Sequence, residues 1–504
     1  MRLSPPRLQT LLATTALSVA LAGCVSSGGL HPQGSLLDPS ALQTSRSLGA
    51  EALTPAAWPT QDWWSGLGDP QLGALIAEAL KNNPGLAVAD ARARQAQAQA
   101  GMADADRRPT INGGASISGA HIPSTVLPPD VGGGHFAWAK YGYASFNWGL
   151  DLWGGKRAAW EAAVGLSRAA EVDAQAARLE LSANVARAYA QLGYAYAQQD
   201  VAKAEAERAT SARKLTLQRV AAGLDSQLQS KQADAEVADA EQSQAVAARA
   251  IDAARSSLAV LLGAGPDRAL DIARPQLLQP AAVAVPAQLP VELLGHRPDL
   301  VAARWRVEAA SKDIGAAKAQ FMPNVSIGAL AGLVALGGTN LFQAPARFYQ
   351  FGPSLSLPIF DGGRLRANLS GKDAEYDIAA AQYNQTLVGA VNQVADDVSA
   401  TQSMQVQIAA QQRALDAASQ AWDLAQQRYQ AGVGSYLEAL SVRQQLLLGE
   451  QRMAALKAQQ IDLSVQLIEA LGGGYRPGAA GAGAAGASQP ADAATSASSS
   501  SSHS

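Results

Sequence analysis

The sequence predicts a mainly α-helical protein with a smaller transmembrane β part, built from one unit that occurs twice. Residues 84–232 are repeated loosely as residues 298–441, and similarity at this scale indicates a duplicated structure. Each copy combines segments of alternating polarity, typical of strands, with one long proline-free stretch, typical of a helix. After the N-terminal segment no apolar run is long enough for a helical membrane span, so any crossing must use strands.

The two copies correspond at their first helices and at the far ends of their long helices. Matched positions are Pro84 with Pro298, Leu86 with Leu300, Val185 with Val394, Arg219 with Arg428, and Gly223 with Gly432. We therefore expect one intertwined unit made of two halves. The expected segments are a signal peptide at 1–23, an extended segment at 24–60, repeats at 61–263 and 291–475, a connection at 264–290, and a disordered Ala/Gly/Ser tail at 476–504.

Composition excludes several functional classes. The net charge is −3 and no basic run occurs, so we expect no nucleic-acid partner. Hydrophobic residues make up 48% but aromatic residues only 5%, which favours long helices packed through small side chains. The five histidines are scattered and show no spacing of a metal site or a nucleophile–base pair. We expect no enzyme activity, no metal and no cofactor.

The N-terminus has the features of a secretory signal. Arg2 and Arg7 precede an apolar stretch that is too short to span a bilayer. The stretch ends in Leu21-Ala22-Gly23-Cys24, which resembles a bacterial lipobox, and Cys24 is the only cysteine. We expect export and acylation of Cys24, palmitate included, which would anchor the chain in lipid. Val25 is not the Asp that retains lipoproteins at the inner membrane, so the outer membrane is expected; an ordinary signal peptide is the alternative.

Four segments alternate between apolar and polar residues, as strands with one lipid face and one water face do. These segments are 111–118, 141–153, 324–331 and 350–359. The candidate pore-lining residues on their polar side are Asn147, Asp151, Ser354 and Ser356. A soluble sheet with one wet face is the alternative. Four strands cannot close a barrel, so strands that span the membrane require several chains to share one.

Each strand pair leads into a helix of unusual length. Between about Arg157 and Ala222 there is no proline, and roughly 66 residues at 1.5 Å rise would extend about 100 Å. Val185, Tyr189 and Leu192 follow coiled-coil spacing, which predicts a buried stripe. Both long helices are predicted to break at a glycine and then to run back as a helical hairpin.

The most specific motif runs from the connection into the second repeat, from Val285-Pro286 to Leu293-Leu294-Gly295-His296-Arg297-Pro298-Asp299-Leu300, and precedes Phe321-Met322-Pro323. Leu150-Asp151-Leu152-Trp153-Gly154 and Leu357-Pro358-Ile359-Phe360-Asp361-Gly362-Gly363-Arg364 follow the strands. With these motifs the chain, from Cys24 to about Tyr475, resembles outer-membrane efflux lipoproteins of the TolC-like superfamily, in the NodT/OprM branch that serves resistance-nodulation-division pumps.

The resemblance implies a homotrimer in which twelve strands form one β-barrel joined to a periplasmic α-helical barrel. It also implies a periplasmic adaptor protein and an inner-membrane pump as partners, besides the lipid of the outer membrane. The adaptor would dock at the hairpin tips, around Gly223 and Gly432 and their neighbours Arg219 and Arg428. The chain would then export small molecules passively, without catalysis.

In that family acidic residues two to three turns past the tip glycine close the tunnel. The corresponding positions here are Glu438 and Ser441, and the second has lost its charge. A threefold ring of Glu438 would attract cations at a narrow opening; a solvated helix-surface Glu is the alternative. Gly434 occupies the place of an arginine that links the constriction in some relatives.

Two further functions remain open from the sequence. One is an exit duct for secreted polypeptides, and the other is a trimeric structural lipoprotein that does not conduct. The aromatic ends of the strands, such as Trp138, Tyr141 and Trp153, favour a membrane pore over a structural stalk. The sequence does not indicate what is transported.

Overall fold

The computed structural model describes residues 27–44, 46, 58–121, 123–126, 128–131, 133–280 and 289–476. The predicted signal peptide, Cys24 and almost all of the predicted tail lie outside the described residues. The chain forms two compact units, and each unit contains parts of both repeats. We call them the strand unit (Met1–Ala41, Ala87–Ala174, Asp299–Gly389) and the tip unit (Leu42–Leu86, Gln175–Pro298, Ala390–Ser504).

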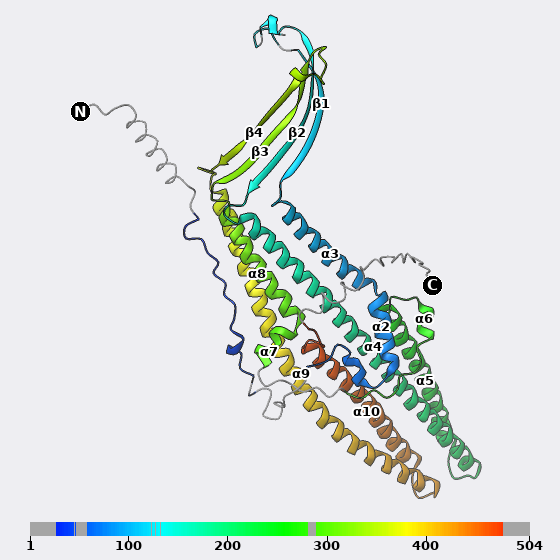
Figure 1. Cartoon of the computed structure of the whole chain (residues 1–504). Coiled ribbons are helices and arrows are strands. Elements are labelled where there is room, and N and C mark those ends of the chain that lie inside the picture. The colour runs from blue at the N-terminus through cyan, green and yellow to red at the C-terminus, as the bar shows by residue number, and fades with distance from the viewer. Residues whose placement is uncertain are drawn as a thin grey trace, which may run out of the picture. The chain divides into compact units, whose positions relative to one another are not determined.

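The strand unit contains one antiparallel four-stranded sheet (Figure 1). Its strands, in spatial and sequence order, are β1 (Thr110–His121), β2 (Phe136–Leu150), β3 (Asn324–Leu336) and β4 (Arg347–Ser356). The two predicted hairpins are confirmed, and β2 also pairs with β3, so that the repeats join in a single sheet.

The register of the sheet separates an apolar face from a polar one. Ile111 lies opposite Phe146, Phe146 opposite Ala329, and Ala329 opposite Phe351. Because directly paired residues point to the same side, the apolar rows of all four strands share one face. This confirms the predicted alternation of the strands.

Two predicted strand ends were wrong. β2 ends at Leu150 and β4 at Ser356, although apolar alternation continues in the sequence to Trp153 and Ile359. The chain turns there because the residues that follow start the next helices. Asp151 accepts hydrogen bonds from the backbone N–H groups of Lys156 (3.0 Å) and Arg157 (2.7 Å), which caps the helix start.

The helices are long and paired. They are α2 (Pro70–Asn82), α3 (Pro84–Ala105), α4 (Gly155–Ala221), α5 (Gln227–Leu261), α6 (Pro266–Leu270), α7 (Leu289–His296), α8 (Pro298–Ala319), α9 (Arg364–Gln430) and α10 (Tyr436–Ala470). Short 3₁₀ turns occur at Pro39–Ala41, Trp63–Leu67, Pro129–Val131 and Ala344–Ala346. α4 and α9 have 67 residues each, which corresponds to about 100 Å and, for α4, agrees with the predicted length. Within the described residues no helix is both long enough and apolar enough to cross a bilayer.

The core of the tip unit contains the predicted stripe, and the core of the strand unit is a smaller apolar cluster. In the tip unit Val185, Tyr189 and Leu192 are completely buried, together with Leu72 and Leu258 from neighbouring helices. The hydroxyl of Tyr189 donates to the Asp69 carboxylate at 2.6 Å, which satisfies a polar group inside this core. In the strand unit a smaller cluster joins the end of α8 to the start of α9 through Ile314, Phe321, Leu365 and Leu369.

Candidate functional site

Two hairpin tips, α4–α5 and α9–α10, form the candidate site of the tip unit. Gly223 and Gly432 have φ angles of +72° and +78°, a left-handed conformation that strains any residue with a Cβ atom. The N–H groups of Leu224 and Val433 donate back to the carbonyl oxygens of Arg219 (2.8 Å) and Arg428 (3.0 Å). This is the usual way in which a glycine ends a helix, so both helices break where the sequence predicted.

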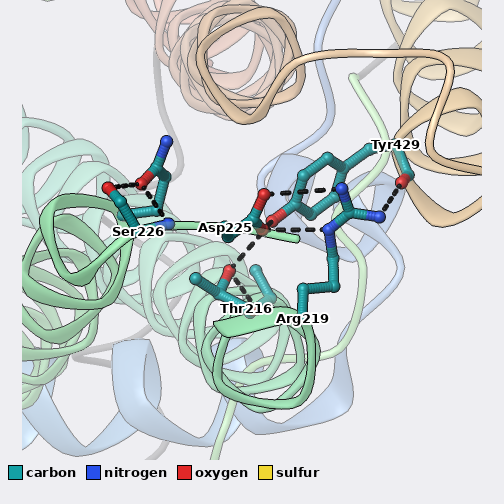
Figure 2. A network of polar contacts seen from close by, with 7 residues as sticks. Thr216, Arg219, Asp225, Ser226 and Tyr429 are labelled. Atoms are coloured by element: carbon teal, nitrogen blue, oxygen red, sulfur yellow. Dashed lines mark hydrogen bonds and ion pairs between the residues drawn. The ribbon is translucent and has the colours of Figure 1, made fainter. Parts of the chain in front are cut away.

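Arg219 joins the first tip to the second. Its Nε donates to Asp225 Oδ2 at 2.9 Å, and its Nη1 donates to the backbone oxygen of Tyr429 at 3.1 Å (Figure 2). The guanidinium also lies over the Tyr429 ring, 4.6 Å from its centroid, an attractive arrangement for a cation and an aromatic face. One side chain from α4 therefore contacts both hairpins.

Asp225 is the common acceptor of this network. The Tyr429 hydroxyl donates to Asp225 Oδ2 at 2.6 Å and lies 3.3 Å from Thr216 Oγ1 (Figure 2). Burial alone would raise the pKa of Asp225, but hydrogen bonds from Arg219 and Tyr429 outweigh it and hold that pKa below its usual value. We call the contacts among Arg219, Asp225 and Tyr429 the tip lock.

The predicted gate residues lie beside the tip lock on the second hairpin. The Glu438 carboxylate lies 3.8 Å from Arg428 Nε, and both side chains are about half exposed. Ser435 Oγ accepts from the Glu438 N–H at 3.1 Å, and Ser441 Oγ donates to the Glu438 backbone oxygen at 2.9 Å. An ion pair as exposed as this one contributes little to stability, and the gate role of Glu438 and Ser441 stays a prediction.

A buried charged cluster links three helices of the tip unit. Arg443 of α10 is only 2% exposed, and it pairs with Glu205 of α4 (3.0 Å) and with Glu236 of α5. Arg208 of α4 binds Glu450 of α10 at 2.7 Å. Burial raises the pKa of Glu236, although the positive charge of the nearby Arg443 acts to lower it. The sequence carries no periodic signal for this cluster, because each member looks like a surface charge on a long helix.

A groove of about 430 Å³ lies between the charged cluster and the tip lock. Its lining includes Arg208, Trp422, Tyr429, Tyr436 and Arg443. The rings of Tyr429 and Tyr436 lie 5.8 Å apart, so an aromatic wall faces charged side chains. The groove combines apolar and charged groups and belongs wholly to the tip unit.

Three of the four predicted pore-lining residues lie on the polar face of the sheet. Asn147, Ser354 and Ser356 share that face by register, and the Ser354 hydroxyl lies 2.7 Å from that of Ser326 on the next strand. Asp151 lies beyond β2, and both its carboxylate oxygens accept N–H groups of α4. The prediction that Asp151 belongs to a strand was therefore wrong.

The polar face also carries aromatic residues, among them Tyr141, one of the predicted aromatic strand ends. Tyr141 stacks on Phe348 of β4 at a centroid distance of 5.4 Å, and Tyr143 lies 5.1 Å from Tyr141. A Cβ atom on Gly332 would come within 2.8 Å of the Phe348 ring. The rings therefore lie flat over the sheet where glycine leaves room for them.

No group of three or more His, Cys, Asp or Glu side chains that could hold a metal ion occurs in the described part of the chain. The tip lock is instead a set of hydrogen bonds and one cation–aromatic contact between two hairpins. Such an arrangement can hold two helical hairpins together or let them part.

Comparison with known proteins decides the family. The model of the outer membrane efflux protein family matches residues 75–264 and 289–473, one stretch in each repeat. The chain belongs to the outer membrane efflux protein family. The predicted family, the fold class, the role as an outer-membrane efflux channel subunit and the outer-membrane location are thereby confirmed.

Individual relatives agree with this assignment over most of their length. The fusaric acid resistance protein FusA of Burkholderia cepacia is 39% identical over 74% of this chain and 71% of its own. The multidrug resistance outer membrane protein MdtP of Escherichia coli K12 is 34% identical over 84% of this chain and 89% of its own. The crystal structure of the outer membrane protein VceC from Vibrio cholerae has a TM-score of 0.78 and 36% identity, covering 83% of this chain and all of that one.

Proposed function

We propose that this efflux protein is the outer-membrane duct of a tripartite pump, in which three copies share one twelve-stranded β-barrel and one helical tunnel. The sheet carries the proposal. Among the described strands, β1 and β4 each pair on one side only, and they have 12 and 10 residues. Backbone groups left unpaired in hydrocarbon cost several kcal/mol each. Pairing of these edges with neighbouring copies removes that cost.

The hairpin tips are proposed to bind a periplasmic adaptor protein, which in turn binds an inner-membrane pump. Leu224 and Leu228 on the first tip are 66% and 65% exposed, and Val433 and Leu437 on the second are 69% and 67% exposed. These residues occupy matching positions of the two copies. Apolar side chains repeated at exposed tips are typical of a surface that docks to another protein.

The tip lock is proposed to hold the tunnel closed. Tyr429, on the second hairpin, donates to Asp225, on the first, while Arg219 spans both. Opening of a tunnel between such hairpins requires this contact to break. Glu438, exposed beside the lock, is proposed to add negative potential at the opening.

The transported molecules are proposed to be small toxic compounds, and the chain a passive conduit without a catalytic step. The names of the relatives, which refer to multidrug and fusaric acid resistance, support this class of cargo. Acylation of Cys24 is proposed to anchor each copy in the outer membrane, beside the spanning strands.

Disulfide cross-linking of the sheet edges tests the shared barrel. One cysteine is placed on β1 at Thr110 and one on β4 at Ser356, two positions at the strand ends that adjoin the helices, in otherwise native protein. The two edges lie on opposite sides of one sheet, so an oxidant can join them only between copies. We expect bands of one, two and three copies and none larger. Monomer alone, or a ladder beyond three, would contradict the closed trimer.

A further inference from the structure

The N-terminal segment lies along α9 in the strand unit (Figure 1). Two side chains of that helix hold it. The N–H groups of Gln33 and Gly34 donate to Asp377 Oδ1 at 2.9 and 2.6 Å. The Leu37 N–H donates to Asn384 Oδ1 at 2.7 Å, and Asn384 Nδ2 donates to the Ser35 backbone oxygen at 2.9 Å. Asp377 and Asn384 thus satisfy four backbone groups of an extended segment.

Two further features fit this segment to α9. A Cβ atom on Gly34 would lie 3.0 Å from Asp377 Oδ1 and 3.1 Å from Asp377 Cα, so glycine allows the backbone to approach the helix closely. Leu30 packs against the apolar cluster that contains Phe321 and Leu369. The segment is therefore fixed by one apolar contact followed by two polar ones.

The spacing on α9 favours this arrangement. Asp377 and Asn384 are seven residues apart, close to two full turns, which puts both side chains on one face of the helix. With Val185 aligned to Val394, the equivalent positions on α4 are Arg168 and Gln175. The Arg168 guanidinium lies over the Trp305 ring, and arginine has no acceptor for a backbone N–H group. The pair that binds the segment thus belongs to the second copy only.

We propose that Asp377 and Asn384 form a clamp that sets how far the lipid-bearing N-terminus can reach from the protein. The inference rests on the proposed acylation of Cys24. Nine residue steps separate Cys24 from Gln33, which allows at most about 30 Å. From Asp377 back to Arg364, where α9 begins, thirteen steps of helix cover about 20 Å. The clamp therefore lets the lipid reach the level where the strands meet the helices, with little excess length.

A tether that was unattached as far as Trp58 would be far longer. The next aromatic contact along the described chain is the stack of Trp58 on His296, with centroids 3.9 Å apart. From Cys24 to Trp58 there are 34 residue steps, an extended length of about 110 Å. Measured to Gln33 instead of to Trp58, the maximum tether length is thus about fourfold shorter, and the Leu30 contact holds the same segment.

Hydrogen exchange of the full-length purified protein in detergent tests the clamp. The test variant is the double substitution Asp377→Ala with Asn384→Ala. The control is Gln382→Ala with Gln385→Ala, two exposed positions on the same helix. We expect amides in residues 30–40 to exchange at least tenfold faster in the test variant and at the native rate in the control. Equal rates in all three proteins would overturn the clamp.

A second measurement follows the reach of the tether and guards against misfolding. Spin labels at Ser27→Cys and Ala367→Cys are carried by a small fraction of the copies, mixed with unlabelled protein, so that a double electron–electron resonance experiment reports the distance between the two labels of one copy. We expect a narrow distribution in the native background and a broad one in the clamp variant, with trimer mass unchanged. A narrow distribution in both proteins would also overturn the proposal.

The mass of the N-terminal peptide shows, in a separate measurement, whether Cys24 is acylated. An unmodified cysteine would remove the lipid anchor from the proposed function and, with it, the role of the clamp as a limit on lipid reach. The exchange experiment on a Cys24→Ser protein would then still show whether the segment docks on α9. Failure of the anchor and failure of the clamp are thus distinguishable.

Discussion

Tyr429→Phe is the substitution that isolates the tip lock. It removes one hydroxyl, which donates to Asp225 at 2.6 Å, and leaves the ring under the Arg219 guanidinium. The Asp225 side chain is 9% exposed, so water replaces the lost donor poorly. Hydrogen bonds to charged groups contribute about 1.5–3 kcal/mol. If the bond exists only in the closed state, a loss of about 2 kcal/mol raises the open-to-closed ratio about 30-fold per copy.

The assay is the open probability of single channels in a planar bilayer. Tyr436→Phe is the matched control, because its hydroxyl is buried next to the same ring and has no hydrogen-bond partner. We expect the Tyr429→Phe channel to be open far more often than the native channel. We expect the Tyr436→Phe channel to have the open probability of the native protein. Equal open probabilities for Tyr429→Phe and the native protein, with both trimeric, would refute the lock.

The remaining predictions concern a buried acid, the sheet and the docking surface. Burial, and after it the charge of Asp396, raise the pKa of Asp397 to about 6. The contribution of Asp397 to the free energy of unfolding is therefore complete below the pKa that this side chain has in the unfolded chain, and it is lost as pH rises through 6. Asp397→Asn is expected to stabilise the fold at pH 7 by up to about 3 kcal/mol and to leave it unchanged at pH 4; an equal change in melting temperature at both pH values would contradict this. Gly332→Ala forces a Cβ atom against the Gly142 backbone oxygen and the Phe348 ring and is expected to lower the melting temperature of the trimer. Gly338→Ala, with open space around it, is expected to leave that temperature unchanged. Leu437→Asp is expected to weaken adaptor binding in a pull-down at least tenfold, with trimer mass retained; undiminished binding would place the docking surface elsewhere.

The parts of the fold that periodicity encodes could be predicted from the sequence. Pro84 and Gly223 recur as Pro298 and Gly432, which predicts the duplication and the ends of the helices. The alternation of apolar and polar residues predicts the shared apolar face of the strands. The strand ends were missed because Leu152 continues the alternation, although Asp151 already caps α4. A local capping interaction outweighed the pattern there.

The tip lock and the clamp could not be predicted, because their partners are far apart in the sequence. Asp225 and Tyr429 are 204 residues apart, and Gln33 and Asp377 are 344 apart. Each residue taken alone is an ordinary polar or aromatic side chain on a helix or a turn. Only the packing of one repeat against the other, or of the N-terminal segment on α9, brings the partners together.

Conductance of the purified protein in a planar bilayer, with its mass determined in the same detergent, tests the central claim most directly. We expect a mass of three copies and discrete current steps, more frequent for Tyr429→Phe. A stable trimer that conducts in neither form would contradict the duct, and a single copy that folds and conducts alone would contradict the shared barrel.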